Sequence, residues 1–119
     1  MNALLAVAVG GALGSLLRYA AGLLVQQPWA TLTVNLVGSF LIGLCALYFA
    51  SGESPLLRLL VITGILGGFT TFSAFSLDSL MLLQLGEWGR ALLYIGGNTL
   101  GGLLACALGM WFFKFFGGL

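Results

Sequence analysis

Four apolar stretches, each long enough to cross a bilayer, constrain the fold of this chain more than any other feature. They cover residues 3–25, 29–50, 55–85 and 90–113, and polar or turn-forming residues separate them. A helix needs about 20 residues to cross the hydrocarbon core, and only helices and closed barrels satisfy every backbone polar group there. We therefore predict an all-α membrane protein, with a single transmembrane domain of four spanning helices over residues 1–119.

The composition excludes several other classes of protein. Only 6% of the residues are charged and the mean hydropathy is +1.15, whereas about a quarter of a soluble domain is charged. The net charge of +1 provides no basic patch for a nucleic acid. There is no histidine, and Cys45 and Cys106 are far apart, so we expect small apolar side chains there rather than a zinc site or a disulfide. The sequence lacks a nucleophile–base or metal-ligand set, so we do not expect an enzyme.

The N-terminal stretch is expected to be a membrane span rather than a cleaved signal peptide. Its first residues, "MNALLAVAVGGALG", lack a positively charged region, and a helical pattern continues past them.

The third stretch is too long for a straight span. About 30 residues would form a helix of about 45 Å, against a hydrocarbon core of about 30 Å. Its centre, "GGFTTFSAFS", begins with Gly67 and Gly68 and continues to Thr70 and Thr71, all of which are weak helix formers. We predict a break near residues 67–71. Because irregular backbone must face protein or water inside a membrane, transporters place ion sites at such breaks.

Small residues at four-residue spacing suggest an alternative role for these glycines. Gly64 and Gly68 form a G-x-x-x-G pair, which lets a second helix approach closely without any break. Similar pairs occur on the first and fourth stretches, at Gly10, Gly14, Gly97, Gly101, Ala105 and Gly109. Four short helices enclose little space for a pathway. The helix faces made of small residues therefore predict an oligomer as well as a tightly packed subunit.

Basic residues are divided evenly between the two sides of the predicted bundle. Arg58 and Lys114 fall on the side of the chain ends, while Arg90 falls on the other side and Arg18 lies nearest to it. An excess of Lys and Arg normally fixes orientation, and here there is none. Either another feature sets one orientation or the chain inserts both ways. We favour dual insertion, which permits an antiparallel dimer with the inverted symmetry of larger transporters.

Several polar side chains fall at membrane depth, where they are costly and often functional. They include Asn35 and Ser39, one turn apart on the second stretch, and Tyr94 and Asn98, one turn apart on the fourth. These side chains either hold the bundle together or line a pathway. Arg18 and Asp78 are the charged residues nearest to burial, and the sequence leaves open whether they pair or mark the mouth of a pathway.

The potential lining of such a pathway is rich in neutral hydrogen-bond donors. They are the hydroxyls of Thr71, Ser73, Ser76 and Tyr94 and the amides of Asn35 and Asn98. Phe72 and Phe75 lie three residues apart, on one helical face, and the positive edge of a phenyl ring can help to solvate an anion. The same spacing also suits rings that only pack or face lipid. Neutral donors would bind a small anion or polar solute without trapping it.

Four motifs together resemble the Fluc-type fluoride channel family. They are "GALGSLLRY", "TLTVNLVGSFLIG", "GGFTTFSAFSLD" and "YIGGNTLGG", which follow one another over nearly the whole chain. The resemblance implies an antiparallel, dual-topology homodimer in the cell inner membrane. It also implies that two pores of this multi-pass protein export fluoride passively from the cytoplasm.

The resemblance assigns roles to individual residues. Phe72 and Phe75 correspond to pore-lining phenylalanines and Asn35 to the pore asparagine, while the main-chain carbonyls of Gly67 and Thr70 from both chains would hold a structural sodium ion at the dimer axis. The remaining correspondences are a polar track at Asp78, Tyr94 and Asn98 and an anion-attracting vestibule residue at Arg18. The chain departs from the family pattern at Asp78, where glutamate is frequent, and at Gly102, where serine or threonine is common.

Two other classes of membrane protein have a similar size. A small four-span multidrug exporter needs a carboxylate inside the membrane; the first stretch has none, and Asp78 is the sole candidate. The other alternative is a structural membrane protein in which the glycines only pack helices.

Overall fold

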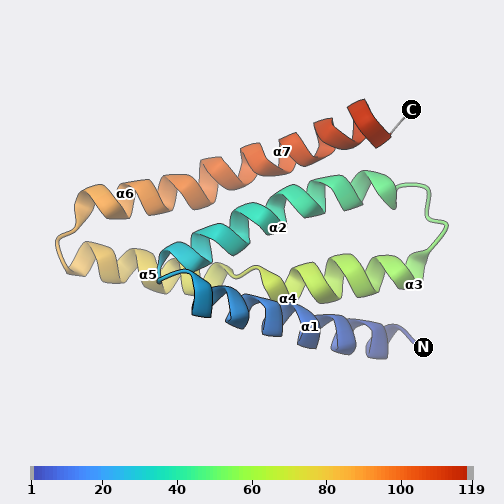
Figure 1. Cartoon of the computed structure of the whole chain (residues 1–119), viewed down its shortest axis with the longest axis horizontal. Helices are drawn as coiled ribbons and strands as arrows, with labels where there is room; N and C mark the ends of the chain where they lie inside the picture. Colours follow the sequence, from blue (N-terminus) through green and yellow to red (C-terminus); the bar gives the residue numbers. More distant parts are fainter. Residues whose placement is uncertain (1, 118–119) are drawn as a thin grey trace.

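The computed structural model describes residues 2–117, and within them it is all-helical with four helices long and apolar enough to cross a membrane (Figure 1). The first two spans are α1 (Ala3–Leu24) and α2 (Trp29–Tyr48). The third contains α3 (Pro55–Arg58), a π-helical segment (Leu59–Leu66), α4 (Gly67–Phe69) and α5 (Phe72–Gln84). The fourth contains α6 (Trp88–Gly96), a π-helical segment (Gly97–Gly101), α7 (Gly102–Phe112) and a last π-helical segment (Phe113–Gly117). The predicted four-span, all-α architecture is confirmed.

Local sequence signals set the limits of these spans. The Asn2 side chain caps α1 by accepting a hydrogen bond of 2.8 Å from the Leu5 amide. Pro55 lies in the first turn of α3, where its missing N–H has no helical partner to lose. Gly52 and Gly86, in the connections before α3 and before α6, have φ angles of 75° and 76°. Glycine adopts such angles without a steric penalty, so both connections turn sharply.

Spans that are consecutive in the chain run in opposite directions along the 50 Å axis of the molecule, so the first span is parallel to the third and the second is parallel to the fourth (Figure 1). Helix α1 packs along the first half of the third span, α2 packs along α7, and α5 pairs with α6. The start of α1, the end of the fourth span and the α2–α3 connection lie at one end of the bundle (Figure 1). The centre of the third span therefore lies between α1 and α2.

Glycines bring the backbones of these helices together. A Cβ atom added at Gly14 would collide with the main-chain oxygen of Ile65, and one at Gly10 would lie 2.8 Å from the Cα of Gly64. Gly43 of α2 and Gly109 of α7 face the partner helix backbone in the same way. These glycine-lined helix faces hold the four-helix bundle together, as predicted for close helix packing.

Large apolar side chains point outward from this framework. Leu4 and Leu24 are 83% and 87% exposed, whereas Ala6, Ala91 and Tyr94 are fully buried. Small residues inside and leucines outside fit a bundle whose solvent is lipid, because lipid tails are as apolar as leucine itself.

We expect Gly14→Ala to separate α1 from the third span. The added methyl group has no room beside Ile65, and overpacking of this kind costs about 1–3 kcal/mol. Thermal unfolding of the purified protein in detergent should show a lower Tm. Gly11→Ala, on the same helix but with no atom within 4 Å of the added Cβ, is the matched control. Equal Tm changes for both variants would contradict the packing described above.

Candidate functional site

The third span is interrupted at two threonines. Helix α4 ends at Phe69 and α5 begins at Phe72, and between them Thr70 (φ −91°, ψ 160°) and Thr71 (φ −152°, ψ 123°) are extended. This interruption is narrower than the expected region of residues 67–71, because Gly67 and Gly68 are helical.

Glycines and threonines have different roles at this point. Gly68 faces the backbone of α1 at Gly11, so it serves close packing. Thr71 compensates for a lost helical bond, since its Oγ1 accepts from the Ala74 amide at 3.2 Å. Thr70 Oγ1 donates to the Leu66 carbonyl at 3.0 Å, which also accepts from the Thr70 amide at 3.2 Å. The two alternatives for this stretch, helix packing and a break, thus apply to different residues.

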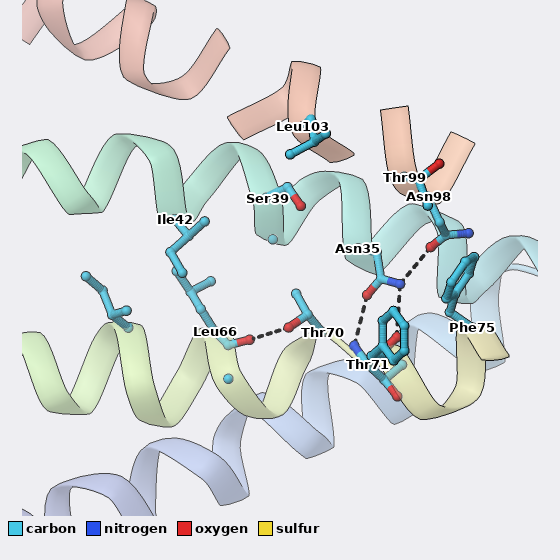
Figure 2. A pocket seen from close by; sticks show the side chains of 14 residues that line it. Asn35, Ser39, Ile42, Leu66, Thr70, Thr71, Phe75, Asn98, Thr99 and Leu103 are labelled. Atoms are coloured by element: carbon cyan, nitrogen blue, oxygen red, sulfur yellow. Dashed lines mark hydrogen bonds between the residues drawn. The ribbon is translucent and has the colours of Figure 1, made fainter. Parts of the chain in front are cut away.

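Asn35 holds the extended backbone from the neighbouring helix α2 (Figure 2). Its Oδ1 accepts from the Thr71 amide at 2.9 Å, and its Nδ2 donates to the Thr71 carbonyl at 3.1 Å. The same Nδ2 donates to Asn98 Oδ1 at 2.7 Å. Since an amide nitrogen carries two hydrogens, both hydrogens of Asn35 are in use. Asn35 can contact an ion only by giving up one of these bonds.

The predicted polar residues of the fourth span continue this network. Asn98 Nδ2 donates to the Tyr94 carbonyl, and the Tyr94 hydroxyl donates to Asp78 Oδ2 on α5, both at 2.9 Å. The buried Tyr94 ring lies between Trp29 and Phe75, with ring centroids 6.0 and 5.8 Å away. The network therefore connects α2, α5 and the fourth span beside the break.

Arg18 and Asp78 have separate partners within the subunit. Arg18 Nε donates to the Gly68 carbonyl at 3.1 Å, at the end of α4, where free carbonyls make the helix terminus negative. Arg18 also borders a shallow hollow of about 290 Å³ with residues of the last turns of α1 and with Gln27. Among residues 2–117 the one ion pair joins Arg90 and Glu87, so Arg18 and Asp78 do not pair within the chain.

Phe72 and Phe75 share one face of α5, directly after the break. Their ring centroids are 5.4 Å apart. Phe72 is 77% exposed, whereas Phe75 is half-buried against Tyr94. The outer ring is thus free to meet a ligand or a second protein chain, while the inner ring is held in place by packing.

A groove of about 540 Å³ brings most of the predicted site residues together. Its lining comes from α2, from both sides of the break and from the fourth span: Asn35, Gly38, Ser39, Ile42, Ile62, Leu66, Gly67, Thr70, Thr71, Phe72, Phe75, Asn98, Thr99 and Leu103. Ser73, Asp78, Tyr94 and Arg18 lie outside this lining. Sequence reasoning missed the apolar members, although Ile42 lies two turns from Asn35 on the same helical face.

The break also leaves two main-chain oxygens free beside the groove. Among the hydrogen bonds of residues 2–117, none is accepted by the carbonyl of Gly67 or Thr70. Carbonyl oxygens are good ligands for a hard cation. In the described part of the chain, no three His, Cys, Asp or Glu side chains come together, and Cys45 and Cys106 are free thiols. Any cation ligands in this groove are therefore neutral oxygens, and the free carbonyls of Gly67 and Thr70 are among them.

Known proteins are similar to this chain over more than nine tenths of its length. Three relatives carry the name fluoride-specific ion channel FluC. The protein of a Thermus thermophilus strain is 53% identical over 116 residues, which cover 92% of this chain and 93% of the relative. Those of Opitutus terrae (93% of this chain, 89% of the relative) and Rhizobium meliloti (92% and 94%) are both 48% identical. Residues 5–110 match the family described as CrcB-like protein, Camphor Resistance. The chain therefore belongs to the CrcB-like protein family.

Proposed function

We propose that this protein is a fluoride-selective channel through which fluoride leaves the cytoplasm passively. The observation that carries the proposal is the break at Thr70 and Thr71, which places two phenylalanines and neutral donors beside one groove. The names of the relatives supply the identity of the ion, since each is a fluoride-specific ion channel.

The surroundings of the break favour a small anion. Helix α5 begins at Phe72, and its first turn points free N–H groups and the positive end of its dipole toward the break. The edges of the Phe72 and Phe75 rings add positive potential without a fixed charge. No charged side chain is among the residues that line the groove. An anion is therefore attracted weakly enough to leave again, as conduction requires.

The remaining predicted residues extend this path in both directions. The Thr71 and Ser73 hydroxyls, 3.3 Å apart, flank the start of α5, and Asn98, Tyr94 and Asp78 continue beyond it as a polar track. Arg18 provides positive charge at the vestibule. The Asp78 carboxylate accepts the Tyr94 hydroxyl hydrogen, so the residue that a proton-coupled multidrug exporter would need already has a partner.

A second copy of the chain, inserted in the opposite direction, would complete the groove. The exposed Phe72 ring and the open side of the groove fit such a partner. Balanced basic residues, Arg58 and Lys114 on one side and Arg90 and Arg18 toward the other, permit both orientations. The proposed assembly is an antiparallel homodimer with two pores in the inner membrane.

A structural sodium ion would fit at the axis of this dimer. The free carbonyls of Gly67 and Thr70 from both subunits would hold it, because a hard cation prefers oxygen ligands. When bound, the ion supplies a positive charge that offsets the negative ends of both α4 helices. Its proposed role is to join the two breaks.

We expect the purified protein in liposomes to pass fluoride rapidly and chloride hardly at all. Phe72→Ile and Phe75→Ile should each lower fluoride efflux at least about tenfold, because a barrier higher by about 1.4 kcal/mol has this effect. Efflux is measured with a fluoride-selective electrode. Phe115→Ile, which changes an exposed ring outside the groove, should have wild-type efflux. Equal fluoride and chloride rates would contradict the channel proposal, and unchanged efflux in both groove variants would assign those rings to packing.

We also expect the chain to insert in both orientations in similar amounts, since neither side has an excess of basic residues. A C-terminal tag probed by protease in intact spheroplasts reports the fraction of each orientation. Adding two lysines after Gly117 should move most chains into the orientation with a cytoplasmic C-terminus. A single orientation of the unmodified chain would disprove the antiparallel dimer.

A further inference from the structure

One hydroxyl in the groove is not engaged by the protein. Ser39, one turn after Asn35 on α2, is half-buried and lines the groove. Among the hydrogen bonds of residues 2–117, none involves its side chain, and no hydrogen bond to it appears in Figure 2. Membrane helices usually engage such a hydroxyl with the carbonyl one turn earlier. Ser39 instead keeps a free donor at membrane depth.

Every other polar side chain that lines the groove makes at least one hydrogen bond within the protein. The Thr70 and Thr99 hydroxyls donate to carbonyls of their own helices, at 3.0 and 2.7 Å. Thr71 Oγ1 caps α5, and both amide hydrogens of Asn35 are in use. Ser39 is therefore the hydroxyl of the groove that makes no hydrogen bond within the protein, so it can bind a ligand with both its donor and its acceptor free.

The space in front of Ser39 is kept open by a glycine. A Cβ added at Gly102 would lie 3.5 Å from Ser39 Oγ, with no other neighbouring atom within 4 Å outside its own helix. Ser39 and Gly102 each lie four residues after Asn35 and Asn98, whose side chains are bonded to each other. Ser39 and Gly102 thus face each other one turn beyond the Asn35–Asn98 contact on the same two helices, but Gly102 has no side chain that could bond the Ser39 hydroxyl.

We propose that Ser39 is an anion-binding residue, whose hydroxyl donates a hydrogen bond to fluoride one helical turn beyond Asn35. This inference rests on the proposed channel function. A neutral hydroxyl can hold a small anion weakly, and the absence of a side chain at Gly102 leaves room for the ion or for a water of its hydration shell. An anion can then bind in the pathway without breaking the hydrogen bonds of Asn35 to Thr71 and Asn98.

Fluoride efflux from liposomes tests this proposal. Wild-type efflux is measured first, because its absence would defeat the channel function rather than the role of Ser39. Ser39→Ala should lower fluoride efflux about tenfold at a fluoride concentration below saturation, the ratio expected for one lost hydrogen bond. Thr33→Val is the control: its hydroxyl lies on the same helix but donates to the Trp29 carbonyl and is outside the groove. Wild-type efflux in Ser39→Ala would overturn the proposal.

A pair of second substitutions separates ion binding from packing. A serine at position 102 would place its hydroxyl in the space next to residue 39. Ser39→Ala with Gly102→Ser should therefore recover most of the efflux, whereas Ser39→Ala with Gly102→Ala should not. Equal efflux in the two double variants would assign Ser39 to packing or to a contact between subunits. If Ser39→Ala is not recovered as a folded protein, Ser39→Gly, which also lacks the hydroxyl, replaces it; unchanged efflux in that variant would equally overturn the proposal.

Discussion

The structure depends on one requirement: a polypeptide inside a bilayer must satisfy its main-chain polar groups. The third span violates the simplest solution, a continuous helix, at Thr70 and Thr71. The Asn35 side chain satisfies the interrupted backbone by pairing with both the N–H and the C=O of Thr71, as a neighbouring strand would. An unsatisfied buried group costs about 1–3 kcal/mol, so a single side chain on α2 offsets much of the cost of the interruption.

The break presents partly negative carbonyl groups on one side and partly positive N–H groups on the other. On one side, the end of α4 presents carbonyls, one of which receives the Arg18 guanidinium while those of Gly67 and Thr70 remain free. On the other side, α5 presents N–H groups beside the Phe72 ring. A continuous helix would offer neither set at this depth. The proposed cation and anion sites therefore arise from one interruption, and they lie within one groove.

Length and hydropathy were enough to predict four spans, because the bilayer fixes how long an apolar helix must be. The break could be anticipated from the excess length of the third stretch and its weak helix formers. Its width could not, since Gly67 and Gly68 stay helical, with Gly68 packed against α1. The pairing of Asn35 with Thr71, the Arg18–Gly68 contact and the free Ser39 hydroxyl depend on how neighbouring helices are rotated. A periodic pattern shows which residues share a face, but not which face meets which neighbour.

The central claim is that the backbone at Thr70 and Thr71 is extended between two helices in the membrane. Solid-state NMR of the protein in lipid bilayers, with glycine, threonine and phenylalanine labelled by ¹³C, measures this directly through the backbone and Cβ chemical shifts. We expect extended shifts at both threonines and helical shifts at Gly68 and Phe72. Helical shifts throughout Gly67–Phe72 would contradict the account, because the free carbonyls, the Asn35 pairing and the placement of both phenylalanines would then have no structural basis.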